Sequence, residues 1–529
     1  MNRYVTATVL VTLGACGDAA RDGARDGASG TSSMDAGALK PGAKAGAGSS
    51  TQGGSGGARF DGDAAVDAPG TAGPGVQPRS GADASTPVAT YPLALSANKE
   101  YLVDAHGNPW FLQGDTAWEL IPSLNQADAL AYLNDRQSRG YNAIIVQAME
   151  HKFTTHSPPW LDVYGNAPFT AAVPGSSDLD FTTPSDAYWK NVDWILQEAN
   201  ARGIVVLFFP AYLGYICQDE GWCGPMGTNG TARMVTYGTY LGNRYKEQPN
   251  IIWVLGGDDT ATGDALAEVN GIVQGIRAAG DTHLMTAHWG YEESAADNNL
   301  SMIPWLQIDT LYTYKDQDLY TKAQSDYARD KGVRPEFLIE ADYEGEHPNS
   351  ATTSDTWRAQ MYEPSLAGSM GFCFGNNPLW DYGTANDGNP GWALATGDQG
   401  IFASWRTCLN SPGSQDGARA GAFFRSIAWQ TLVPDTSAHV LTSGSGVVAA
   451  ASADGKLAVA YFSRGGSADI NLAAFSGAVS AQWFDPSSGA YTTISGSPFA
   501  HSGSHTFMSP AHNSVGLTDW VLVLRASAP

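Results

Sequence analysis

Hydrophobic residues between positions 91 and 375 fall into two kinds of segment that alternate along the chain. Short, nearly continuous apolar runs have the length of a buried strand, and several stretches between them repeat apolar residues every three or four positions, as an amphipathic helix does. A Gly or Pro precedes most of the runs and marks the end of a helix. The expected strands are residues 110–113, 142–147, 204–209, 251–255, 283–287, 306–312, 337–340 and 370–374.

Short apolar strands that alternate with helices are typical of a parallel sheet covered by helices. Eight such units in about 300 residues predict an α/β fold with a (β/α)8 barrel of the TIM type, which we place at residues 91–430. An open, doubly wound sheet is the alternative, but no glycine-rich phosphate-binding turn follows an early strand.

From residue 431 onward the pattern changes. Residues 447–450, 457–462, 479–484 and 520–524 are short segments rich in β-branched or aromatic residues, and turns of Gly, Ser and Asp separate them. This pattern predicts a small antiparallel β-sandwich at residues 431–529.

Residues 1–16 have the pattern of a bacterial export signal. Arg3 precedes an apolar run at residues 5–13, which leads into the sequence LGAC at residues 13–16. The run is too short to span a bilayer, and the small residues before Cys16 resemble a lipoprotein cleavage site. We expect an exported protein anchored through a lipid on Cys16; an ordinary signal peptide with a chance cysteine is the alternative. Residues 17–90, rich in Gly, Ala, Ser and Asp, are expected to form a disordered tether.

The four remaining cysteines suggest two disulfides in an oxidising compartment. Cys217 and Cys223 lie close together in one loop, and the second pair would be Cys373 with Cys408. A buried free thiol is the alternative at Cys373, which falls inside an apolar run. Because no Cys or His spacing typical of a metal site occurs, neither a metal nor a cofactor is expected.

Charge and aromatic content narrow the choice of partner. The net charge of −24 disfavours binding to nucleic acid or to an anionic membrane surface, so the lipid anchor is the only expected membrane contact. The chain contains 16 Trp, and aromatic faces are common platforms for sugar rings. We expect a monomer whose partner is an oligo- or polysaccharide.

Polar residues at the ends of the predicted strands are the candidates for chemistry, because barrel enzymes act at the carboxyl ends of their strands. Asp258 follows the fourth strand and Glu340 ends the seventh, so their carboxylates are expected to face each other. Glycosidic cleavage needs such a pair, one acid to protonate the leaving oxygen and one carboxylate to attack C1 or activate water. Taken singly, the aspartate could be a turn or cap residue and the glutamate a structural ion pair.

Other side chains near the strand ends are predicted to contact the substrate. Amides, aromatic rings, a histidine and further carboxyl groups suit a polyhydroxylated ligand. The candidates are Asp115, Trp118, Gln147, His288, Tyr312, Glu344, Asn376 and Trp380.

Several motifs resemble the apiosidase-like family of glycoside hydrolases. They are VDAHGNPWF at residues 103–111, GDTAWEL at 114–120, YLNDR at 132–136, WVLGGD at 253–258 and EADYEG at 340–345. The sequence WFDPSSG at residues 483–489 is similar to the β-domain that usually follows this barrel and is labelled as collagen-binding. The resemblance covers residues 92–525.

The resemblance implies a barrel glycosidase with an aspartate acid/base on the fourth strand and a glutamate nucleophile on the seventh. These roles fall on Asp258 and Glu340, while Asp259, Glu344 and Glu346 lie close enough in sequence to compete for them. We expect a retaining hydrolase of plant or microbial polysaccharide; the sugar is not implied, because pocket loops differ freely on one barrel. The alternatives are a sugar-binding surface lipoprotein without catalysis and a protein that binds host matrix through its C-terminal domain.

Overall fold

The computed structural model describes residues 90–149, 158–218, 220–298, 300–314, 318–345, 354–383 and 404–527. The predicted export signal with Cys16, the predicted tether up to residue 89 and the competing residue Glu346 lie outside these segments. Within the segments, no helix is both long and apolar enough to cross a membrane.

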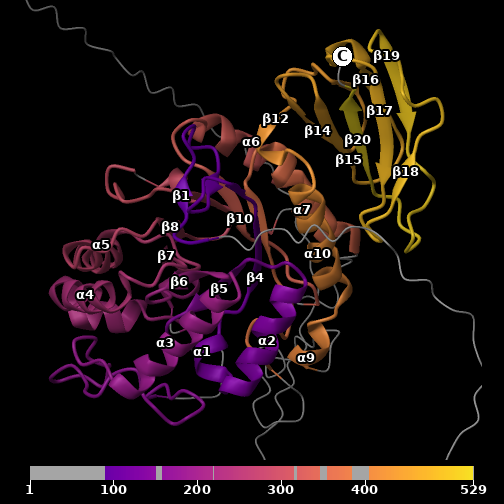
Figure 1. Cartoon of the computed structure of the whole chain (residues 1–529). Coiled ribbons are helices and arrows are strands. Elements are labelled where there is room, and N and C mark those ends of the chain that lie inside the picture. Colours follow the sequence, from indigo (N-terminus) through magenta and orange to yellow (C-terminus); the bar gives the residue numbers. More distant parts are fainter. Residues whose placement is uncertain are drawn as a thin grey trace, which may run out of the picture. The chain divides into compact units, whose positions relative to one another are not determined.

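Eight parallel strands form the central sheet, in the order β8-β7-β6-β5-β4-β11-β10-β9 (Figure 1). The two outer strands β8 and β9 also contact each other, so the sheet is a nearly closed barrel. The strands are β4 (Leu112–Thr116), β5 (Ala143–Gln147), β6 (Val205–Phe209), β7 (Ile251–Gly256), β8 (Met285–His288), β9 (Asp309–Tyr312), β10 (Glu336–Glu340) and β11 (Gly371–Phe374). The predicted barrel is confirmed, and every expected strand is present.

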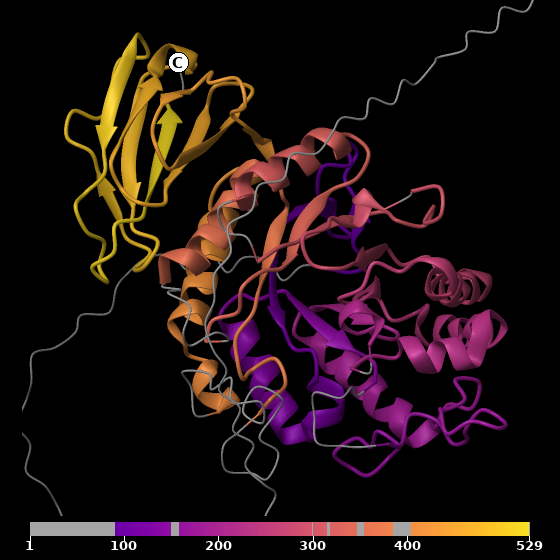
Figure 2. The ribbon, with the colours of Figure 1, turned by 180° about the vertical axis from the view of Figure 1, so that it is seen from behind.

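Helices cover the outer surface of this sheet, as the two opposite views in Figures 1 and 2 show. The predicted amphipathic faces are buried: in α3 the residues Val192, Ile195 and Leu196 point to the core, and in α5 so do Val269 and Ile272. The helices are α1 (Leu120–Ser123), α2 (Gln126–Ser138), α3 (Asp186–Ala201), α4 (Cys223–Tyr245), α5 (Gly263–Ala278), α6 (Leu319–Asp330), α7 (Ser354–Ala367), α9 (Trp405–Cys408) and α10 (Pro412–Arg425).

A small antiparallel sheet closes the amino-terminal end of the barrel. It consists of β1 (Ala94–Leu95), β2 (Leu102–Val103) and β3 (Pro109–Trp110). Leu102 and Trp110 pack in one cluster with barrel residues such as Val205 and Ile252. The expected strand at residues 110–113 is therefore shifted, because Trp110 pairs with Leu102 in this sheet and β4 begins at Leu112. The carboxyl ends of the barrel strands remain at the opposite end.

The C-terminal strands form two antiparallel sheets, in the orders β12-β14-β15-β20-β17-β18 and β13-β16-β19, which confirms the predicted β-sandwich. Residues such as Phe462, Ile470 and Trp483 fill the core between them. The strands are β12 (Leu432–Pro434), β13 (Leu441–Ser443), β14 (Val447–Ser452), β15 (Leu457–Phe462), β16 (Ser467–Asn471), β17 (Val479–Phe484), β18 (Tyr491–Thr493), β19 (Ser504–Met508) and β20 (Trp520–Ala526).

The sandwich shares a second hydrophobic core with helices α7 and α10 of the barrel. The rings of Tyr362 on α7 and Tyr461 on β15 stack at 5.1 Å. Beside them Arg358, which is 1% exposed, bonds through Nε to Asp519 at 2.6 Å and through Nη1 to Asp416 at 2.9 Å. Buried charges are tolerated only when they are paired and hydrogen-bonded, so this ion group fixes how the sandwich meets the barrel.

The structure confirms one predicted disulfide and contradicts the other. Cys217 and Cys223 are bonded, whereas Cys373 and Cys408 are buried free thiols. Cys373 lies on β11 and packs inside the barrel against Gly114. Cys408 lies on α9 in a different hydrophobic cluster. The prediction of a Cys373–Cys408 disulfide was wrong because the strand and the helix place the two thiols in separate parts of the core.

We predict that Arg358→Ala destabilises the whole chain, because it leaves Asp519 buried without its cation and leaves Asp416 with Arg419 alone. Removing one partner of a buried ion pair costs about 3–5 kcal/mol. The control is Arg406→Ala, which removes an ion pair with Asp128 from a side chain that is 53% exposed and should cost at most about 1 kcal/mol. Urea denaturation followed by tryptophan fluorescence measures both. Equal midpoints for the two variants would contradict the structural role of Arg358.

Candidate active site

Two glycines place Asp258 beyond the end of β7. Gly256 and Gly257 have φ angles of 91° and 115°, which strain any residue with a side chain. A Cβ on Gly256 would lie 2.3 Å from the main-chain oxygen of His288, and a Cβ on Gly257 would lie 2.2 Å from the ring of Tyr212. The chain can turn tightly against β8 only because both side chains are absent. The turn ends at Asp258 with a φ of 53°, a conformation that Asp adopts more readily than most residues.

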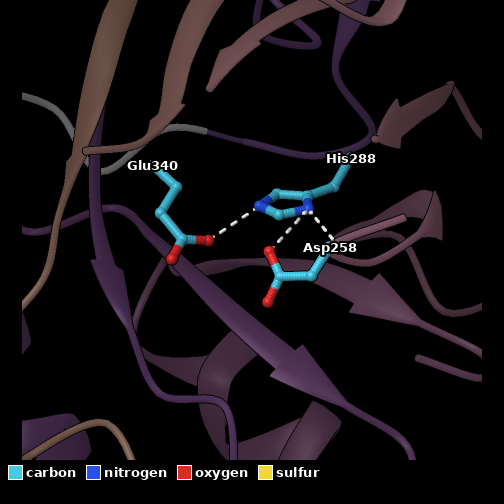
Figure 3. A group of neighbouring side chains, drawn as sticks. All are labelled: Asp258, His288 and Glu340. Carbon is cyan, nitrogen blue, oxygen red and sulfur yellow. Dashed lines mark hydrogen bonds and ion pairs between the residues drawn. The ribbon is translucent and has the colours of Figure 1, made fainter. Parts of the chain in front are cut away.

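Asp258, His288 and Glu340 come together at the carboxyl ends of β7, β8 and β10 (Figure 3). Nε2 of His288 lies 2.7 Å from Oε2 of Glu340, and Nδ1 lies 3.2 Å from the main-chain nitrogen of Asp258. Oδ1 of Asp258 lies 3.9 Å from the same Nδ1 atom. One carboxylate oxygen of Asp258 and one of Glu340 lie within 4.8 Å of each other. The histidine ring therefore bridges the two candidate carboxylates.

Tyrosine hydroxyls complete the hydrogen bonding of both carboxylates. Tyr212, which follows β6, donates to Oδ2 of Asp258. Tyr314 donates to Oε1 of Glu340 at 3.3 Å, and Tyr343 also hydrogen-bonds with Glu340. The Glu340 side chain is 6% exposed and the Asp258 side chain 19%. Glu340 is thus the more enclosed carboxylate and the one with more donors.

The surroundings change how Glu340 and His288 titrate. Burial, followed by the charge of Asp258, raises the pKa of Glu340 above its ordinary value, although the hydrogen bond from His288 opposes this shift. Burial lowers the pKa of His288, but its bond to Glu340 and the charge of that residue outweigh burial, so the pKa of the ring is raised. Glu340 therefore takes up a proton at a higher pH than an exposed glutamate would.

Aromatic rings enclose His288, whose side chain is fully buried. The centroid of its ring lies 4.6 Å from that of Tyr312, 5.7 Å from that of Trp118 and 5.9 Å from that of Phe209. Trp118 also donates from Nε1 to the Tyr343 hydroxyl at 2.8 Å, and Trp380 packs in the same cluster. Of the predicted substrate contacts, Trp118 and Tyr312 thus lie beside His288, while His288 faces the carboxylates themselves.

The family model described as "Apiosidase-like, catalytic domain" matches residues 96–431, which is more than half of the chain. The chain belongs to the apiosidase-like family. A second family model, described as "Putative collagen-binding domain of a collagenase", matches residues 433–525. The enzyme is a glycoside hydrolase, in agreement with the motifs found in the sequence.

Solved structures of glycoside hydrolases have the same fold. A family 5 glycoside hydrolase from Bacteroides vulgatus is 23% identical, with a TM-score of 0.69 over 83% of this chain and 93% of its own. A second glycoside hydrolase is also 23% identical, with a TM-score of 0.68 over 83% of this chain and 98% of its own. A search of the curated protein sequences gives no match.

Within the described segments, Asp258, His288 and Glu340 are also the acidic and histidine side chains that lie close enough together to hold a metal ion. Their hydrogen bonds oppose that use. The main-chain N–H of Asp258 occupies the lone pair of Nδ1, and Nε2 carries the hydrogen shared with Glu340, so the ring has no free lone pair for a metal. The geometry is that of a hydrogen-bonded acid–histidine–acid group.

The predicted substrate contact at Asp115 needs correction. Its side chain is fully buried, accepts a bond of 2.7 Å from the Tyr132 hydroxyl and lies 3.4 Å from Nη1 of Arg136. Tyr132 and Arg136 both belong to α2. Because successive strand residues point to opposite faces of a sheet, Asp115 is directed at the covering helix and joins it to β4.

Glu344 and Asn376, two predicted substrate contacts, bond to each other and to the start of α10. Oε1 of Glu344 accepts from the main-chain N–H of Gly413 at 2.9 Å, and Oε2 accepts from Ser411 and from Asn376. Ser411 caps α10, so Glu344 lies at the amino-terminal end of that helix, where a carboxylate is favoured. Glu344 therefore holds α10 in place through its bonds to Ser411, Gly413 and Asn376.

Gln147 lies at the end of β5 and donates from Nε2 to the buried Glu119. Sequence reasoning gave no role to Glu119 or to the three tyrosines that bond to the carboxylates, although Tyr212 and Tyr314 follow predicted strands. Tyr212, Tyr314 and Tyr343 each stand within three residues of the end of a barrel strand. An aromatic hydroxyl at that position is the signal that could have identified them.

We predict that Glu344→Gln leaves catalysis nearly intact but weakens the fold. The amide nitrogen of Gln would meet one of the donors that now bond to Glu344, and an unsatisfied buried polar group costs about 1–3 kcal/mol. The matched variant Glu340→Gln should stop hydrolysis, and urea denaturation of both variants separates loss of activity from loss of folding. Loss of activity in a well-folded Glu344→Gln variant would instead assign Glu344 to the reaction.

Proposed function

We propose that this enzyme hydrolyses glycosidic bonds of plant or microbial polysaccharide with retention of configuration, with Glu340 as nucleophile and Asp258 as acid/base. The observation that carries the proposal is the separation of the two carboxylates, whose oxygens approach within 4.8 Å. Retaining glycosidases keep their carboxyl groups about 5–5.5 Å apart, whereas inverting ones leave about 6.5–9.5 Å for a water molecule. The shorter class fits Asp258 and Glu340.

The surroundings of each carboxylate support these two roles. A nucleophile must be ionised, and the hydrogen bonds that Glu340 receives from His288, Tyr314 and Tyr343 favour the carboxylate, against the burial that raises its pKa. An acid/base must gain and lose a proton in each cycle, and Asp258 has the more exposed side chain. Asp258 then protonates the glycosidic oxygen while Glu340 attacks C1, and later Asp258 takes a proton from the water that cleaves the glycosyl ester.

The substrate is proposed from the family and from the aromatic wall. Trp118 and Tyr312, whose rings contact that of His288, supply aromatic surface for a sugar ring beside the carboxylates. Because the family is described as apiosidase-like, terminal apiose on a pectic oligosaccharide is the first substrate to test, within a panel of aryl glycosides of other sugars. A sugar-binding protein without catalysis would have no need for two carboxylates joined by one histidine.

Substitution of the two carboxylates tests the mechanism. Glu340→Ala should abolish turnover, and azide should restore activity with a product of opposite anomeric configuration, seen by proton NMR. Asp258→Ala should lose about 10²–10⁴-fold in kcat/KM on substrates with poor leaving groups and little on activated ones, because protonation matters least there. Glu247→Ala, at the amino-terminal end of the barrel, is the control. If both active-site variants hydrolyse every substrate of the wild type, the two-carboxylate mechanism is wrong.

We further propose that the enzyme is exported and held on a membrane by a lipid on Cys16. The support is the apolar run at residues 5–13 followed by small residues and a cysteine. Cells that express the full chain should incorporate labelled palmitate into it, and Cys16→Ser should remove the label while Cys373→Ser keeps it. Label that survives in Cys16→Ser would show that the cysteine is not the anchor.

A further inference from the structure

His288 makes two hydrogen bonds whose partners fix where its hydrogen lies. The main-chain N–H of Asp258 can only donate, so the Nδ1 atom that it meets at 3.2 Å must accept. The hydrogen of the neutral ring is then on Nε2, which lies 2.7 Å from Oε2 of Glu340. Glu340 is the acceptor of this second bond, and a carboxylate accepts it better than a protonated acid does.

The tautomer depends on the same turn that places the acid/base. The main-chain N–H of Gly257 donates to the carbonyl of His288 at 2.6 Å, which holds the turn against the end of β8. The next amide, that of Asp258, then reaches Nδ1 of the same histidine. Asp258 therefore supplies both a carboxyl group for the reaction and the N–H group that orients His288.

We propose that His288 is a positioning residue that couples the two carboxylates through this single tautomer. Its Nε2–H orients Glu340 for attack and favours the ionised form, and its Nδ1 anchors the turn that carries Asp258. The ring is fully buried, so it acts through the two carboxylates and does not touch the substrate. This inference rests on the function proposed for Asp258 and Glu340.

The other groups around Glu340 differ from His288 in kind. They are Asp258 on the turn after β7, Tyr212 after β6, Tyr312 on β9, Tyr314 after β9, Tyr343 after β10 and Cys373 on β11. Burial raises the pKa of Tyr212, Tyr312 and Cys373 far above neutrality. These three groups stay uncharged during turnover, whereas loss of His288 removes a donor bonded directly to the nucleophile.

Two amide variants separate the two contacts of the ring. In His288→Asn, the side-chain oxygen can replace Nδ1 and accept from the Asp258 amide, but nothing reaches Glu340. In His288→Gln, the side-chain N–H can replace Nε2 and donate to Glu340, but nothing holds the Asp258 amide. The probes are the 2,4-dinitrophenyl and phenyl glycosides of the sugar that the wild type hydrolyses.

We expect the two variants to fail differently. His288→Asn should lose about 100-fold in kcat/KM on both probes, as misplacement of a reacting group does, and its acid limb should move to higher pH because the bond that lowers the pKa of Glu340 is gone. His288→Gln should stay within about 10-fold on the dinitrophenyl substrate and lose about 100-fold on the phenyl one, because only the latter needs a well-placed acid.

The control is His283, which precedes β8 and bonds through Nδ1 to Asp281 at 2.9 Å. His283→Asn and His283→Gln should change neither the dependence on leaving group nor the acid limb. The coupling would be overturned if His288→Gln lost as much activity on the dinitrophenyl probe as on the phenyl probe, as His288→Asn is expected to do. It would also be overturned if neither variant lost activity. The failure of the proposed function is a separate outcome, in which Glu340→Ala retains full turnover.

Nitrogen NMR of the wild type tests the tautomer without any substitution. With histidine labelled on both ring nitrogens, one of the 10 His residues should show a hydrogen on Nε2 and none on Nδ1 at the pH of highest activity. Its signals should be the ones that are absent from His288→Gln. A hydrogen on Nδ1 of His288 at that pH would overturn the inference.

Discussion

The tight turn of Gly256 and Gly257 against the end of β8 is the constraint on which the rest of the site depends. The turn brings the backbone so close to the His288 carbonyl and the Tyr212 ring that no Cβ fits at either glycine. That approach directs the Asp258 amide at Nδ1 of His288, and the ring is then directed at Glu340. The backbone path of the turn after β7 thus orients three side chains that come from three strands. Such an arrangement holds reacting groups rigidly.

This rigidity requires that the barrel strands keep their register, and the C-terminal sandwich contributes to it. Helix α7 joins β10, which ends in Glu340, to β11, and it also carries Arg358 and Tyr362. Arg358 forms an ion pair with Asp519 of the sandwich, and the ring of Tyr362 stacks on that of Tyr461 of the sandwich. The sandwich therefore braces α7, the helix between the strand that ends in Glu340 and β11. Part of its surface is buried in a core shared with the barrel and is unavailable to a partner such as collagen.

The sequence predicted the fold well because apolar periodicity is a local property. All eight barrel strands and the two carboxylates at the ends of β7 and β10 could be identified, since position at a strand end depends only on where the apolar run stops. The directions of side chains could not be predicted. Asp115 lies one residue from the end of β4, and whether it faces the barrel mouth or α2 depends on the pleat of the strand.

Contacts between residues far apart in the sequence could not be predicted either. Glu344 bonds with residues of the α10 cap nearly seventy positions later, and Cys373 and Cys408 both fall in apolar surroundings that are different parts of the core. The role of His288 could not be read either, because it depends on the register of β7 against β8, where Gly256 pairs with His288. The sequence indicated a histidine near the substrate, and the structure places it between the two carboxylates.

The buried carboxylates of the chain are held in different ways. Asp115 and Asp519 are paired with the guanidinium groups of Arg136 and Arg358, whereas Glu344 is held by Ser411, Asn376 and a main-chain N–H group. In the mechanism proposed above, Glu340 loses its charge when it forms the glycosyl ester, and a buried guanidinium beside it would then be left without a partner, at a cost of several kcal/mol. Within the described residues Glu340 is bonded by tyrosine hydroxyls and by one histidine. Donors of this kind stabilise the carboxylate without a permanent guanidinium charge beside it, so they suit a group that must be ionised before the attack and neutral after it.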